Sequence, residues 1–206
     1  MQRIVGAGKK GAGLFFLPNM RKNGSDPISP MHFEHLIQIN DPRLALVELL
    51  SRQQLWLGLV HRGRSPAVFA RGLECSTVDS ESRDADITTL NRTLDFGGFR
   101  VRDRVQLVEG SHIVITAVAT EQWPQSTLSI AIEEPAPELL FLRFIYAYPD
   151  ADFGQPEDRL VAELRRQAYE QSDIDSVVRI REMAANGALG DYAAPHSPGY
   201  GTLVPQ

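Results

Sequence analysis

The amino-acid sequence predicts an α+β fold in a single domain, and three observations support this prediction. Six consecutive runs of strand-forming residues are separated by short turn sequences, which is typical of an antiparallel meander. One strand and two short helical segments precede these runs, and one long amphipathic helix follows them. With 206 residues, 43% of them hydrophobic, the chain is large enough to bury a sizeable core.

The first elements are expected between residues 32 and 63. Apolar residues alternate imperfectly through 32–39, which predicts a strand. An Asp-Pro pair then supplies an N-cap and a proline at the first helical position, which predicts a short helix over 41–50. The S-x-x-Q capping box at 51–54 opens a second short helix, which ends at Gly63.

Six further strands are predicted from their β-branched and apolar content and from the Gly- and Pro-containing turns between them. The expected strands cover residues 68–78, 86–96, 99–108, 111–120, 126–133 and 138–148, with a loop at 79–85. Pro156, followed by two acidic residues that suit the positive end of a helix dipole, opens a long helix that ends at Gly187. At 1.5 Å per residue this helix is roughly 45 Å long, enough to cross the domain.

Both ends of the chain are rich in glycine and proline and have no apolar periodicity. We therefore expect a flexible leader at 1–30, one folded domain at 31–189 and a flexible tail at 190–206. Residues 6–11 formally match G-x-G-x-x-G, but a dinucleotide site needs a strand before these glycines and a helix after them, and neither is predicted. No cofactor is expected.

Composition excludes several classes of function. The net charge of -5 and the pI near 5.5 provide no positive field for nucleic acid. No apolar run approaches the roughly 18 to 20 residues of a membrane span, so no stable membrane insertion is expected. The single cysteine permits no intramolecular disulfide, which predicts a cytoplasmic location. The histidines lack metal-ligand spacing, so no metal is predicted, and the sequence leaves the oligomeric state open.

The order of these elements, together with three segments, resembles a known superfamily. The segments WLGLVHRGRSP, TLNRTLDFGG and RVQLVEG are similar to the AtaL-like branch of the SRPBCC superfamily of START, pathogenesis-related and polyketide-cyclase-like proteins, over residues 31–187. The resemblance implies a helix-grip fold, in which a seven-stranded curved sheet and two short helices wrap around the long C-terminal helix. It also implies an apolar cavity, which members use for lipids, hormones, polyketides or aromatic compounds.

Strand register predicts what lines this interior. If Gly97-Gly98 is a two-residue turn, Arg92 lies directly opposite Asp103 on an otherwise apolar face. If Glu109-Gly110 is also a two-residue turn, Thr116 lies beside Asp103 and His112 beside Leu107 on the same face.

Two interpretations of this polar row stay open. Arg92, Asp103 and Thr116 hold the polar group of a mainly apolar ligand, or Arg92 and Asp103 form a purely structural ion pair. His112 is a candidate acid or base if it lines the cavity, and a simple strand-end residue otherwise.

Three single residues complete the candidates. Trp56 is expected in the core or the cavity wall, with direct ligand stacking as the alternative. Cys75 is expected to be a buried, inert thiol, because no base is predicted near it. Arg71 shares its phase with inward residues, yet exposure at the sheet edge is the favoured interpretation.

Three functions follow from these features. The first is binding of a small hydrophobic or amphipathic molecule in the cavity. The alternative is a cofactor-independent enzyme of the polyketide cyclase/aromatase kind, with Arg92, Asp103 or His112 moving a proton. A protein-interaction module is the third, and it predicts an exposed apolar patch and a filled interior.

Overall fold

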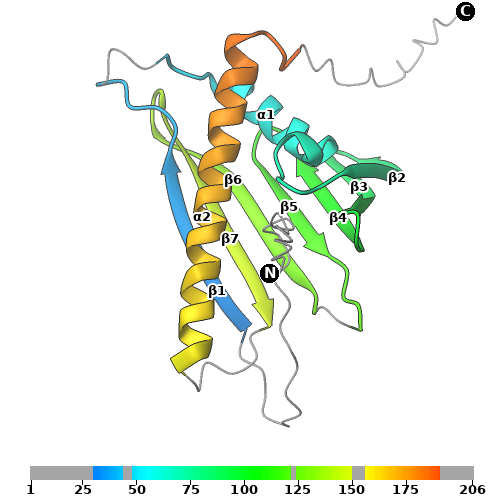
Figure 1. Ribbon diagram of the computed structural model, residues 1–206. Helices are drawn as coiled ribbons and strands as arrows, with labels where there is room; N and C mark the ends of the chain where they lie inside the picture. Colours follow the sequence, from blue (N-terminus) through cyan, green and yellow to red (C-terminus); the bar gives the residue numbers. More distant parts are fainter. Residues whose placement is uncertain (1–29, 44–47, 122–123, 150–155, 191–206) are drawn as a thin grey trace, which may run out of the picture.

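A seven-stranded antiparallel sheet forms the body of the protein (Figure 1). The computed structural model describes residues 30–43, 48–121, 124–149 and 156–190. The strands are β1 (Pro30–Gln38), β2 (Cys75–Asp84), β3 (Ile87–Asp95), β4 (Arg100–Val108), β5 (His112–Ala117), β6 (Ser126–Ala136) and β7 (Leu139–Pro149). They lie in the order β1-β7-β6-β5-β4-β3-β2, so β1 pairs with the last strand and the predicted meander makes up the rest.

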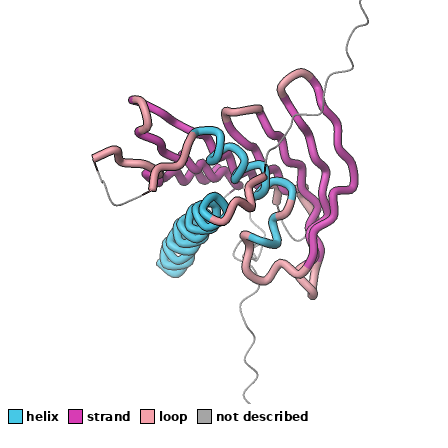
Figure 2. The backbone as a smooth tube through the Cα atoms, turned by 90° about the horizontal axis from the view of Figure 1, so that it is seen from above, coloured by secondary structure: helices cyan, strands magenta, loops and turns pink. Residues whose placement is uncertain are grey.

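The helices lie on one side of this curved sheet (Figure 2). They are α1 (Arg52–Arg64), the 3-10 turn η1 (Pro66–Val68) and the long α2 (Pro156–Ala185). Ser51 and Gln54 form the predicted capping box at the start of α1. A seven-stranded antiparallel sheet with a long C-terminal helix against it confirms the helix-grip architecture expected from the sequence.

The core lies between the sheet and the helices, because apolar residues alternate along every inner strand. Side chains of β3 and β4 are alternately buried and exposed or half-buried along each strand, as the period of two requires. Buried residues from α1, α2 and the five strands β3 to β7 join in one main apolar cluster, which includes Leu59, Phe144 and Ile180. Of the described helices, none is long and apolar enough to cross a membrane.

The predicted register of β3 and β4 is confirmed. Arg92 pairs with Asp103, Leu94 with Val101 and Leu90 with Val105. The turn between these strands closes with a hydrogen bond from Phe96 N to Phe99 O (3.0 Å), and Gly97 takes a left-handed φ of 78°.

The predicted register of β4 and β5 is wrong by one residue. Val108 pairs with His112, so the turn holds three residues, Glu109 to Ser111, rather than two. Gly110 adopts a left-handed φ of 66°, a conformation found in three-residue hairpin loops. Because side chains alternate with a period of two, the extra residue reverses which face each β5 side chain occupies.

Two other local predictions fail near the sheet edge. The strand expected at 68–78 begins only at Cys75 and runs on to Asp84, through the segment expected to be a loop. Cys75 is exposed rather than buried, because β2 is an edge strand that is exposed along almost its whole length. Arg71 is exposed as favoured, and it forms an ion pair with Asp175 (3.1 Å).

The remaining predictions concern the short helices and the chain ends. In the segment expected to form the first short helix, residues 41–43 and 48–50 are not helical, and 44–47 lie outside the described residues. The expected leader, including the glycine motif at 6–11, and nearly all of the expected tail also lie outside them. The long helix runs from Pro156 without a break at 171–173.

Candidate functional site

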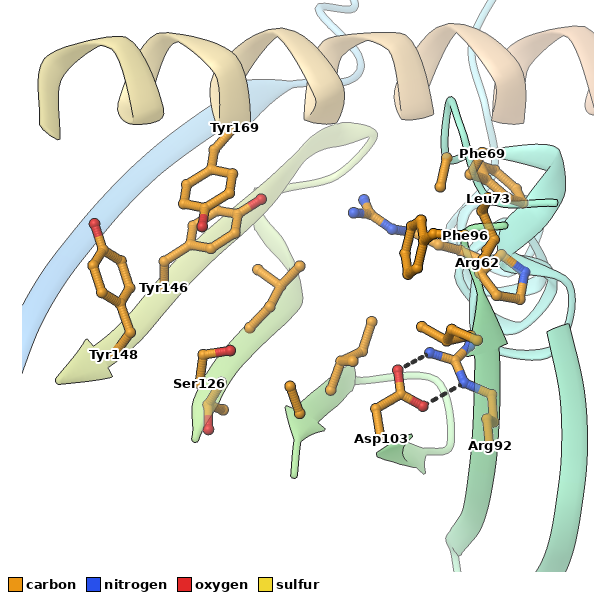
Figure 3. Close-up of a pocket in the computed structure, with 17 residues that line it drawn as sticks. Arg62, Phe69, Leu73, Arg92, Phe96, Asp103, Ser126, Tyr146, Tyr148 and Tyr169 are labelled. Carbon is orange, nitrogen blue, oxygen red and sulfur yellow. Dashed lines mark hydrogen bonds and ion pairs between the residues drawn. The ribbon is translucent and has the colours of Figure 1, made fainter. Parts of the chain in front are cut away.

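A cavity of about 70 Å³ lies between α2 and the inner face of the sheet (Figure 3). The sheet, α2, the end of α1 and the segment from η1 to β2 each contribute part of its wall. Its lining is mainly apolar and aromatic, and comprises Arg62, Pro66, Phe69, Ala70, Leu73, Arg92, Leu94, Phe96, Asp103, Ile115, Ala117, Ser126, Thr127, Leu128, Tyr146, Tyr148 and Tyr169. An apolar wall with a few polar groups is typical of small-molecule sites.

Arg92 and Asp103 form a buried ion pair in this wall, and their side chains are only 2% and 3% exposed. Arg92 Nε donates to Asp103 Oδ1 at 2.9 Å and Nη2 donates to Oδ2, a two-pronged geometry (Figure 3). Arg92 Nη1 also donates to the carbonyl of Gly63, at the C-terminal end of α1. The pair therefore ties the end of α1 to the sheet and keeps both buried charges compensated.

Asp173 of α2 is the centre of a second buried polar cluster. It is fully buried, and its Oδ1 accepts from both terminal nitrogens of Arg62 at 3.3 Å. Its Oδ2 accepts from the Tyr146 hydroxyl at 2.7 Å and lies 2.9 Å from His35 Nε2. Arg62 and Tyr146 also line the cavity, so this cluster contributes polar groups to the cavity wall.

Three tyrosines form the wall opposite the Arg92–Asp103 pair (Figure 3). The rings of Tyr146 and Tyr169 stack at 4.3 Å and are almost parallel. Burial raises the pKa of the Tyr146 phenol well above its usual value, and the nearby Asp173 charge raises it further. Burial also raises the pKa of Tyr169, to about 12. Both phenols are therefore neutral at physiological pH and present O–H groups near the cavity.

The structure places the sequence-predicted candidates in different parts of the molecule. Arg92 and Asp103 lie together in the cavity wall as predicted. The expected places of Thr116 and His112 are wrong, because the longer β4–β5 turn puts Ala117 opposite Asp103 and Ile113 opposite Leu107. Trp56 is buried in the main apolar core and lies outside the lining of the cavity.

The cluster around Asp173 was not predicted from the sequence. One signal was available: Asp173 shares a helical face with Tyr169, Val177 and Ile180, and a lone carboxylate on such a face needs a buried partner. Its partners were not predictable, because β1, α1 and β7 supply them from far along the chain.

Within the part of the chain that the structure describes, no group of three or more His, Cys, Asp or Glu side chains is placed to hold a metal ion. The polar groups of the site are thus the Arg92–Asp103 ion pair, the cluster around the single carboxylate of Asp173, and neutral hydroxyls. Such groups can orient a ligand by hydrogen bonds or transfer a proton to it.

Comparison with solved structures shows a shared fold. The di-domain ARO/CYC StfQ from the steffimycin biosynthetic pathway matches with a TM-score of 0.55 at 11% identity, over 77% of this chain and 52% of that chain. This chain thus spans about half the length of StfQ. The Zhui aromatase/cyclase from Streptomyces sp. R1128 matches with a TM-score of 0.52 at 12% identity, over 78% of this chain and 98% of that one. Ara h 8.0201 matches at 0.51 and 10% identity, over 77% and 99%.

Comparison of the sequence identifies the family. No curated protein matches the chain significantly. Residues 37–187 match the family model described as AtaL, "Acetylaranotin biosynthesis cluster protein L". This span runs from the end of β1 past the end of α2 and includes every wall of the cavity. The chain therefore belongs to the AtaL family, and it shares the helix-grip fold of the solved structures.

Proposed function

We propose that the protein binds one small hydrophobic or amphipathic molecule in the cavity beneath α2. The observation that carries this proposal is the combination of an apolar, aromatic lining with a small number of buried and oriented polar groups. The fold supports it, because a helix-grip sheet holds its long helix against a single concave face. The single cysteine is in keeping with a cytoplasmic location of the protein.

The size of the cavity limits which ligands can bind without a change in its walls. Its volume of about 70 Å³ is smaller than the roughly 300 to 1,000 Å³ of a site for a drug-sized ligand, so part of its wall moves when a larger ligand enters. The segment at 66–73 supplies four lining residues and is the wall least restrained by regular structure. Its Arg71 reaches α2 through an exposed ion pair, which contributes little stability.

Arg92 and Asp103 are the proposed anchor for the polar group of the ligand. Their charges compensate each other, so the anchor favours a neutral or zwitterionic polar group that both accepts from the guanidinium and donates to the carboxylate. Thr116, His112 and Trp56 are left out of the proposed contacts, since the cavity lining does not include them.

A second candidate function is a cofactor-independent cyclase or aromatase. One observation favours it: the neutral Tyr146 phenol lines the cavity and donates to the buried Asp173. In an intramolecular aldol condensation, an enol carbon bonds to a carbonyl carbon while the enol O–H gives up a proton and the carbonyl oxygen takes one. The new hydroxyl then leaves as water together with a hydrogen of the former enol carbon. Tyr146 is suited to give the carbonyl oxygen this proton when its O–H turns from Asp173 to the substrate. The two aromatase/cyclase structures share the fold that such a reaction would use.

Native mass spectrometry of the protein purified from cells tests binding directly, through a retained small molecule. A hydrophobic fluorescent probe should also bind with a stoichiometry near one, and fatty acids or aromatic compounds should displace it. Ala117→Val adds two methyl groups inside the cavity and should weaken probe binding at least tenfold. Ala131→Val adds the same groups elsewhere on the sheet and should leave binding unchanged. Several weak sites, or equal effects of both variants, would contradict the proposal.

The enzyme candidate has its own test. A short poly-β-ketone surrogate should be cyclised by the wild-type protein, and Tyr146→Phe should slow this reaction at least 100-fold while the probe still binds. If the protein binds the probe but shows no turnover, the enzyme candidate is contradicted and the binding function is the one that stands.

A further inference from the structure

The outer face of α2 carries a regular exposed stripe, and only at its C-terminal end does another described segment approach it, where Val178 borders a surface groove with residues 67–71. The stripe consists of Leu160, Leu164, Gln167, Gln171, Ile174 and Val178, which we call the outer stripe. Its four apolar side chains are 63%, 54%, 41% and 50% exposed, in chain order. Figure 2, which views α2 nearly end-on, shows the sheet and α1 to one side of this helix. The stripe has no part in the cavity.

The spacing of the outer stripe is that of a helix–helix seam. Its residues follow one another at intervals of four, three, four, three and four, which is the a/d repeat of a coiled coil. An isolated surface leucine needs no explanation, but four exposed apolar residues in one seam form a patch of the kind that marks an interface.

The seam is also symmetric about its own centre. Positions 160 and 178, 164 and 174, and 167 and 171 are each equally far from residue 169. Two such helices laid antiparallel about a two-fold axis at that level match apolar with apolar and glutamine with glutamine. This self-complementarity is what an isologous dimer interface requires.

We propose that α2 mediates a homodimer, in which the outer stripes of two copies pack antiparallel. Leu160 then packs against Val178 of the partner, and Leu164 against Ile174 of the partner. The Gln167 and Gln171 amides, which now bond to Glu163 and Asp175 of their own helix, are exposed and free to exchange these bonds for bonds across the axis. The order of apolar residues and amides along the stripe matches itself when reversed, which favours a second copy of this chain as the partner.

The available area sets the strength of this dimer. From Leu160 to Val178 the outer stripe is roughly 27 Å long, and with a contact width of about 10 Å it offers about 270 Å² per copy and about 540 Å² in total. Stable dimers bury more, typically about 1,200 Å² or above, so this dimer is weak and depends on protein concentration.

Sedimentation equilibrium of the full chain over a wide concentration range tests the proposal. The wild-type protein should show a reversible monomer–dimer equilibrium. Leu164→Glu places a charge in the seam twice per dimer and should weaken dimerisation at least 100-fold, and Ile174→Lys should do the same. The matched control is Val118→Glu, which alters an equally exposed apolar residue away from α2 and should leave the equilibrium unchanged.

A double variant tests the antiparallel direction. In the antiparallel dimer, Leu164→Glu combined with Ile174→Lys brings each new carboxylate against a new ammonium group of the partner, so dimerisation should return at least partly. In a parallel dimer the same double variant would set like charges opposite each other and remain monomeric. At concentrations where the wild-type protein is monomeric, all single variants should melt at the same temperature as the wild type. They should also bind the cavity probe normally, because the altered residues are exposed.

Three results would overturn the proposal. These are a wild-type protein that stays monomeric at millimolar concentration, a dimer that tolerates Leu164→Glu as well as Val118→Glu, and a double variant no better at dimerising than either single variant. None of these results bears on ligand binding in the cavity.

Discussion

Two oppositely charged pairs are buried side by side beneath α2, Arg92 with Asp103 and Arg62 with Asp173. Burying an ion costs several kcal/mol, and each pair recovers this cost only because hydrogen bonds satisfy both partners. Arg92 uses the Gly63 carbonyl and Asp173 uses the Tyr146 hydroxyl for this purpose. Removing one partner of either pair should therefore destabilise the fold, because the remaining charge stays buried without compensation.

The first prediction concerns the Arg92–Asp103 pair. Arg92→Ala or Asp103→Ala leaves the other charge buried without its partner, and each should lower the free energy of unfolding by about 3 to 5 kcal/mol. The double variant should cost less than the sum, with a coupling of about 1 kcal/mol or more, as measured by urea unfolding. Additive effects within about 0.5 kcal/mol would mean that the two side chains act independently.

Replacing the pair with apolar residues separates its structural role from its ligand role. Arg92→Met with Asp103→Leu removes both charges and fills the same space. If this protein folds and keeps full affinity for the probe, the pair is structural. If it folds and loses the probe, the pair is the polar anchor.

A second prediction concerns the alkaline range. The pKa of Tyr169 is raised to about 12 by burial, whereas an unfolded tyrosine titrates near 10. Between these values the unfolded chain loses this proton and the folded protein keeps it, so stability is present below pH 10 and falls as the pH rises toward 12. Tyr169→Phe should reduce this fall and remove one late-titrating phenol from the absorbance titration. An unchanged titration would contradict the assignment.

At the scale of elements, the position of Arg62 depends on how closely α1 approaches α2. Gly58 lies one helical turn before Arg62, and a Cβ built there would come within 2.5 to 2.9 Å of the Ile180 side chain. Only glycine permits this approach, which brings the end of α1 to Asp173.

The third prediction follows from this contact. Gly58→Ala should destabilise the fold by about 1 to 3 kcal/mol through overpacking, although alanine favours helix. Ile180→Ala alone removes the three carbons that a Cβ at position 58 would meet, and should cost about 2 to 5 kcal/mol. Combined with Gly58→Ala, it should cost less than the sum of the two single losses, in thermal or urea unfolding. A neutral Gly58→Ala would show that the two helices separate at no cost.

At the scale of the whole molecule, residues 31–189 are proposed to form the complete folding unit. The fourth prediction is that a chain trimmed to these residues melts within about 5 °C of the full chain at equal protein concentration, because the removed ends lack apolar periodicity. Equal concentration matters, since dimerisation raises the melting temperature by mass action. A larger drop would show that one of the ends packs on the domain.

The α+β class, most of the strands, the long helix and the pairing of Arg92 with Asp103 could be predicted from the sequence. These features depend on short-range physics: the period of two in β3 and β4, the capping box at Ser51, and a two-residue turn that fixes register over one hairpin. The β4–β5 hairpin shows the limit of that reasoning. Glu109-Gly110 suits a turn of either two or three residues, and the choice moves Thr116 and His112 to other positions.

The contacts around Asp173 could not be predicted from the sequence, because they depend on how the elements pack together. His35, Arg62 and Tyr146 reach Asp173 across 138, 111 and 27 residues of chain, and no periodic pattern encodes such contacts. They arise because β1 pairs with β7 and because Gly58 lets α1 touch α2. For the outer stripe of α2, the spacing of the residues can be recognised in the sequence. Their exposure cannot, because it depends on which face of the helix packs against the sheet. Local patterns thus fix the elements, whereas the packing between elements fixes the site.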